Sequence, residues 1–144
     1  MPACVPGPAG LVAALLREIA GLLAALLHDS SGETAIDLRS LPMSSSEREQ
    51  LGAFLGRGEI DADCDVAGIT SVRETRYAGV WWVVHRAADG SALVEQIVVA
   101  RVPGLLLAHP ADIDAARQNL GRRLDGSGVA VETSNLPLEN PTWR

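Results

Sequence analysis

Cysteine is scarce in this sequence, which excludes a disulfide framework. The 144 residues contain two cysteines, Cys4 and Cys64, and neither belongs to a CxxC pair or another zinc-binding spacing. The sequence also lacks a phosphate loop, a GxSxG elbow, an HExxH motif and a dinucleotide-binding glycine pattern. We therefore expect no metal, no cofactor and no catalytic residues, and a reducing compartment such as the cytoplasm suits the chain.

Positive charge is also in short supply. Eighteen acidic residues against twelve basic ones give a net charge of -6, so nucleic acid and anionic membranes are not expected partners. Residues 11–27 resemble a membrane span, but Arg17 and Glu18 interrupt the apolar run at its centre. Each charge costs about 2.5 to 3.5 kcal/mol there, and the run also lacks the flanks of a signal peptide. An amphipathic helix of a cytoplasmic protein is the better interpretation.

What the sequence does contain is clear apolar periodicity. Apolar residues that recur every three or four positions predict three helices. They are expected over 9–28, for about three turns after Ser44, and from His109 to about Leu124. Alternation predicts strands over 34–38, 59–66, 69–76, 79–86 and 92–102, with a hairpin turn at 88–91. The fold class expected is α+β, a mostly antiparallel four- to five-stranded sheet with helices packed on it. We expect a single domain over residues 1–144, with its core over 34–124 and a flexible tail over 125–144.

Two local details extend this prediction. The second helix has capping-box spacing at Ser44 with Glu47 and again at Ser46 with Glu49. The last helix is expected to turn its apolar residues inward, namely Ile113, Ala116, Leu120 and Leu124.

One run carries a family resemblance. Residues 71–83, SVRETRYAGVWWV, resemble the C-terminal conserved region of the HupH/HyaF/HoxQ hydrogenase expression and formation proteins. Four further segments agree in order, IDLR at 36–39, LPMS at 41–44, LGRGEI at 55–60 and VARVP at 99–103. The similarity extends along roughly residues 34–124.

This resemblance implies a cytoplasmic, chaperone-like accessory factor in [NiFe]-hydrogenase maturation. Its partners would be a hydrogenase subunit precursor, the iron–sulfur small subunit above all, and other maturation proteins. The family brings no catalytic residues that can be carried over to this chain. Its members are often longer and have an N-terminal half that this chain is expected to lack, with the 9–28 helix replacing some of its packing.

The expected partner-binding residues surround two neighbouring indoles. Trp81 and Trp82 must point to opposite faces of the sheet, so one is expected in the core and the other beside Tyr77, as an anchor for a client protein. The alternative is that a helix covers one face of the sheet, and that either a second copy of the chain or the 9–28 helix covers the other. The broad apolar face of the first helix makes a homodimer plausible. Arg73, Glu74 and Arg76 would form either cross-strand ion pairs or a polar rim around the indole.

A rival function uses different residues. Cys64, Glu74 and His85 could be imagined as a metal site, as the pocket of a small-molecule or metal carrier near Cys64 and His85, or as the centre of a thiol-dependent enzyme. Their spacing does not support this, because single residues on separate strands converge only in one exact register. Packed side chains on alternating strands are the commoner outcome.

Overall fold

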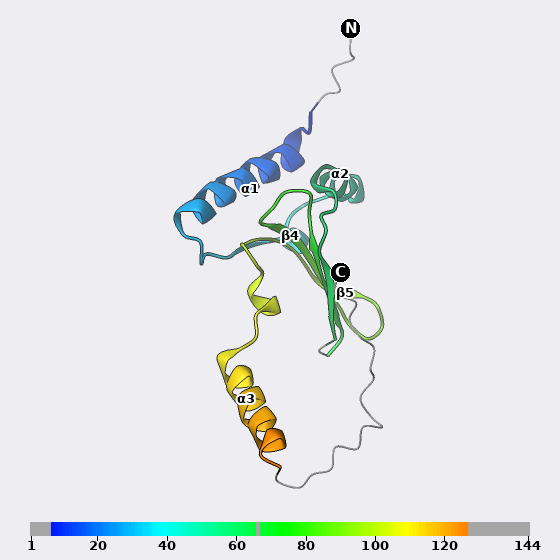
Figure 1. The fold of residues 1–144 in the computed structure, drawn as a ribbon. Helices are drawn as coiled ribbons and strands as arrows, with labels where there is room; N and C mark the ends of the chain where they lie inside the picture. The colour runs from blue at the N-terminus through cyan, green and yellow to red at the C-terminus, as the bar shows by residue number, and fades with distance from the viewer. Residues whose placement is uncertain (1–6, 66, 127–144) are drawn as a thin grey trace. The chain divides into compact units, whose positions relative to one another are not determined.

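Five strands form one open antiparallel sheet in the order β1-β5-β4-β3-β2 (Figure 1). The structure, a computed structural model, describes residues 7–65 and 67–126. The strands are β1 Thr34–Asp37, β2 Asp61–Asp65, β3 Ile69–Glu74, β4 Val80–Arg86 and β5 Ala92–Val99. The helices are α1 Gly10–His28, α2 Ser45–Leu55 and α3 Pro110–Leu124, with short 3-10 turns at Leu38–Ser40 and Gly104–Leu106. The predicted α+β class with a mostly antiparallel sheet is confirmed.

Local signals set the element boundaries. Of the two capping boxes that the spacing allowed, Ser44 with Glu47 forms: the Ser44 side chain accepts from the Glu47 amide at 3.1 Å, and the Glu47 carboxylate accepts from the Ser44 amide at 2.8 Å. The β4–β5 hairpin turns where it was predicted, with Gly90 at φ +86 and the Asp89 carboxylate accepting from Ser91. Glycine suits this left-handed conformation because it has no Cβ.

α1 and α2 cover one face of the sheet. Residues from both helices form a buried cluster with residues of the edge strand β1 and of the inner strands β5 and β4. Its members are Val12, Leu15, Ile19, Ile36, Leu38, Leu51, Leu55, Val80, Trp82, Ile97 and Val99. Because successive strand residues point to opposite faces, this cluster takes every second position of β4 and β5.

The intervening positions form a second buried cluster on the other face of the sheet. It consists of Val72, Trp81, Val83, Val98 and Ala100, with Leu106 of the second 3-10 turn packed against it. Both faces of the central strands are therefore apolar and buried, as the continuous apolar run in β4 suggests.

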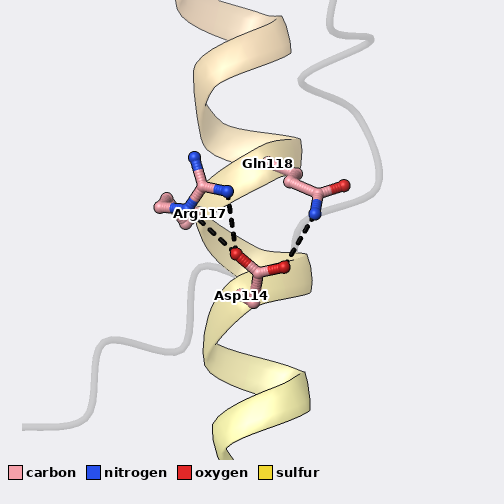
Figure 2. A network of polar contacts seen from close by, with 3 residues as sticks. All are labelled: Asp114, Arg117 and Gln118. Atoms are coloured by element: carbon pink, nitrogen blue, oxygen red, sulfur yellow. Dashed lines mark hydrogen bonds and ion pairs between the residues drawn. The ribbon is translucent and has the colours of Figure 1, made fainter.

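The chain divides into two compact units, Met1–Leu107 and Ala108–Arg144. In the second unit, α3 begins at Pro110 with the His109 ring accepting from the Ala111 amide at 3.2 Å. Within the helix, Asp114 accepts from Arg117 and Gln118 at 2.8 Å (Figure 2).

The expected inward stripe of α3 is not covered by the described residues of its own unit. The helix has no buried residue, and its four apolar residues, Ile113, Ala116, Leu120 and Leu124, are all exposed. The periodicity identified the helix correctly, but a periodic stripe does not specify which surface covers it. Most of the flexible tail predicted over 125–144 lies outside the described residues.

Candidate functional site: an apolar surface beside the first helix

The turn between β3 and β4 is held against the end of α2. The Arg76 amide donates to the Leu55 carbonyl at 2.8 Å. Thr75 is buried, and its hydroxyl lies 3.2 Å from both the amide and the carbonyl oxygen of Tyr77. The ETRYAG run therefore builds a rigid turn that places Tyr77 next to α2.

Glu74 has a structural task in the same turn. Its carboxylate accepts from the Glu59 amide at 3.2 Å, and its backbone pairs with Gly58 and Ile60. Among the residues that the structure describes, Arg73, Glu74 and Arg76 form no ion pairs, so the expected cross-strand ion pairs are absent there.

Both indoles are buried. Trp81 is 3% exposed and donates from Nε1 to the Ala100 carbonyl at 3.0 Å. Trp82 is 7% exposed, faces α1 and α2, and has the Arg73 guanidinium 6.0 Å from its ring centroid. The opposite orientation of the two rings is confirmed, but the expectation of one exposed indole is wrong, because each face of the sheet has its own buried cluster.

The exposed aromatic pair is a different one. Tyr77 stacks on Phe54 of α2, with ring centroids 6.0 Å apart and an interplanar angle of 6°. Each of the two residues is 40% exposed. The pair borders an apolar hollow of about 400 Å³ whose opposite wall is α1, including Leu16, Ile19 and Leu23.

A second hollow lies along the C-terminal half of α1. It measures about 620 Å³ and is lined by Leu23, Leu26 and Leu27 together with the β4 approach at Ala78 and Gly79. Leu27 is 88% exposed. We call the two hollows together the α1 surface, defined by Leu16, Leu23, Leu26, Leu27, Phe54 and Tyr77.

α1 itself has the length and apolarity of a membrane span, with a mean hydropathy of 2.0. That is weak evidence for a span, because Val12, Leu15 and Ile19 bury one side of the helix in the core of the fold. The α1 surface contains Leu16, Leu23 and Leu26, which are partly buried against this core, and the exposed Leu27.

The structure keeps Cys64 and His85 on separate strands. Each pairs with Thr70 of the intervening β3, and the Thr70 hydroxyl lies 2.7 Å from Nδ1 of His85. Neither residue lines the α1 surface, and the described residues contain no group of three or more metal-ligand side chains.

Two carboxyl groups have a lowered pKa, and both lie in exposed turns. Hydrogen bonds from the side chain and amide of Ser31 lower the pKa of Asp29, and those from Ser91 lower the pKa of Asp89. These pKa shifts result from the geometry of the two turns, and neither aspartate belongs to the α1 surface.

Taken together, the fold is that of a small α+β protein whose covering helix leaves an apolar flank exposed. The profile of the HupH hydrogenase expression protein, C-terminal conserved region, matches residues 11–126. The chain belongs to this family, as the resemblance at 71–83 predicted.

A solved structure agrees with this assignment. The chain is similar to the hydrogenase expression protein HupH from Thiobacillus denitrificans ATCC 25259, with 39% sequence identity and a TM-score of 0.76. The match covers 83% of this chain and 98% of that chain. The comparison with curated proteins gave no match. Membership supports a role in hydrogenase expression or maturation.

Proposed function

We propose that the chain is a non-catalytic, chaperone-like factor that binds a hydrogenase subunit precursor in the cytoplasm. The precursor of the iron–sulfur small subunit is the client we favour, with other maturation proteins as further partners. The observation that carries the proposal is the α1 surface. There Leu27 and a stacked aromatic pair are exposed, and Leu16, Leu23 and Leu26 are only partly buried beside the core. Contiguous exposed apolar surface of this kind marks protein-binding sites.

The physical basis of binding is burial. Covering a fully exposed leucine contributes about 1.5 to 3 kcal/mol, and Leu27 is nearly fully exposed. Tyr77 offers a rigid aromatic contact beside exposed Arg76, and tyrosine and arginine are enriched among residues that dominate interface energetics. Of the six residues first expected at the interface, these two keep that role in the proposal. Arg73 and Glu74 support the turn and the sheet, and Trp81 and Trp82 support the core.

Such a factor acts by mass action. It stabilises the form of the client that exposes apolar surface, and it releases that surface when the mature partner binds more tightly. The α1 surface is mainly apolar, and the titratable residues that line its hollows are Arg17, Tyr77 and Arg101. The described residues that line it include no carboxylate, histidine or cysteine, which favours this role over a catalytic one.

The test is capture of a tagged small-subunit precursor by the Leu27→Glu variant. A charge in the centre of the apolar contact should reduce capture at least about tenfold, because burying an unpaired carboxylate outweighs the lost leucine contact. The matched control is Leu93→Glu, since Leu93 is also exposed, at 53%, but lies on β5 away from the α1 surface.

Melting temperatures of both variants should match that of the parent, because neither leucine belongs to a buried cluster. Equal capture by the parent and by Leu27→Glu would contradict the proposal. If Leu27→Glu instead dissolves a homodimer and leaves capture intact, a second copy of the chain is the occupant of the surface.

A further inference from the structure

A third hollow, mainly polar where the first two are apolar, lies next to α2 on the same face of the sheet. It measures about 550 Å³, with Trp82 and Val84 of β4 among its walls. Four arginines from four parts of the chain line it, Arg48 of α2, Arg57 of the following loop, Arg73 of β3 and Arg86 of β4. The acidic chain, with a net charge of -6, thus concentrates a third of its twelve basic residues in one cavity.

Three carboxylates share the hollow, Asp61 and Asp63 of β2 and Glu95 of β5. Two of them are engaged with arginines: Arg48 Nε lies 3.5 Å from Glu95 Oε1, and Arg57 lies 3.6 Å from Asp61. Asp63 accepts a hydrogen bond from the Ser71 hydroxyl at 2.7 Å. Four guanidinium groups against three carboxylates leave one positive charge in the lining.

Two arginines of the hollow, Arg86 and Arg73, have no ion pair among the residues that the structure describes. Arg86 donates to the Gly90 carbonyl at 3.4 Å, whereas the described residues provide no such acceptor for Arg73. Arg73 is half-buried, and its guanidinium lies over the Trp82 ring.

The Nε atom of Arg73 is buried without a hydrogen-bond partner in that part of the chain. The Nε atom of Arg48 is also buried, and its ion-pair partner is the Glu95 carboxylate at 3.5 Å. A buried donor without an acceptor is costly, particularly on a charged group. Both arginines line the same hollow.

From this geometry we propose that the hollow, here called the arginine pocket, binds a single carboxylate group. A guanidinium fork matches a carboxylate through two parallel N–H···O bonds, and one negative charge neutralises the lining. A phosphate dianion would exceed that charge and meet the three carboxylates already present. The proposal does not depend on the α1 surface or on its client, because the two sites share no lining residue.

The test is an acetate titration of the full chain at neutral pH, followed through the Nε–H signals of arginine in ¹⁵N-correlated NMR spectra. We expect saturable shifts of the Arg73 and Arg48 signals with a dissociation constant in the millimolar range. Chloride at equal ionic strength should give no saturation, and phosphate should bind more weakly than acetate. Two further ligands then identify the source of the carboxylate. Acetylated glycine carries a chain-terminal carboxylate and the amide of acetylated aspartate carries a side-chain carboxylate, so the one that binds more tightly indicates the natural source.

Variants assign the effect to the pocket. Arg73→Gln should weaken acetate binding about tenfold or more, because hydrogen bonds to charged groups are among the strong ones. Arg73→Lys, which keeps the charge without the fork, should give an intermediate loss even if the glutamine variant folds poorly. Arg123→Gln removes an exposed arginine of α3 outside the pocket and should bind as the parent does. Linear shifts identical for acetate and chloride, phosphate binding tighter than acetate, or full affinity in both Arg73 variants would overturn the proposal.

Discussion

At the scale of single residues, Gly58 shows how tightly the β3–β4 turn is packed. A Cβ on this glycine would lie 2.5 Å from the Thr75 carbonyl oxygen and 2.7 Å from Glu74 Oε2. The first contact is with backbone, which cannot rotate away. We therefore expect Gly58→Ala to lower the free energy of unfolding by about 1 to 3 kcal/mol, the usual cost of overpacking, measured by urea denaturation.

The matched control is a glycine with free space around it. Gly21 lies inside α1, and an added Cβ would meet nothing within 4 Å. Gly21→Ala should stabilise the protein by about 0.5 to 1 kcal/mol, because alanine has the higher helix propensity. If both variants shift the urea midpoint in the same direction, the contact at Gly58 does not have the role given to it here.

At the scale of elements, the start of α2 offers a choice that the structure resolves. Ser44→Ala removes the side-chain acceptor of the Glu47 amide and should cost about 1 kcal/mol. Ser46→Ala, which removes the rival serine of the same spacing, should change stability by less than about 0.5 kcal/mol because Ser46 is exposed and caps nothing. Urea midpoints of the two variants give the comparison, and a larger loss for Ser46→Ala would reverse the assignment.

The elements also show which parts of the fold the sequence could predict. The Asp89-Gly90 turn and the alternation along β2 are local signals, and both were predicted with nearly the right bounds. The choice between Ser44 and Ser46 was not predictable, because both have a glutamate three residues later. The burial of both indoles was not predictable either, because alternation assigns each ring to a face, while the cover of that face comes from distant segments such as Leu106.

At the scale of the whole molecule, both candidate sites depend on contacts between segments far apart in the sequence. The α1 surface joins Leu16, Phe54 and Tyr77, and no periodicity links the three. Asp61 and Asp63 are exposed residues of β2, and both border the arginine pocket together with residues of α2 and β5. Only Arg76 and Tyr77 of the predicted interface remain exposed, because the motif that carries the family resemblance mainly builds the turn.

The division into two units leads to a test of where stability resides. Every residue described as buried lies between Val12 and Pro103, and the first unit ends at Leu107. A chain ending at Leu107 should therefore unfold cooperatively in urea with nearly the midpoint of the full chain. It keeps the buried residues that set both the free energy of unfolding and the slope of the transition, and the midpoint is the ratio of these two quantities.

A chain ending at Val99 provides the contrast. It lacks Ala100 and Pro103, both buried, and the Leu106 contact to the second cluster. It also removes the Ala100 carbonyl that accepts from the Trp81 indole, leaving a buried donor without a partner at a cost of about 1 to 3 kcal/mol. This chain should unfold at a clearly lower urea concentration. A broad, non-cooperative transition for the chain ending at Leu107 would show instead that the core needs residues of the second unit.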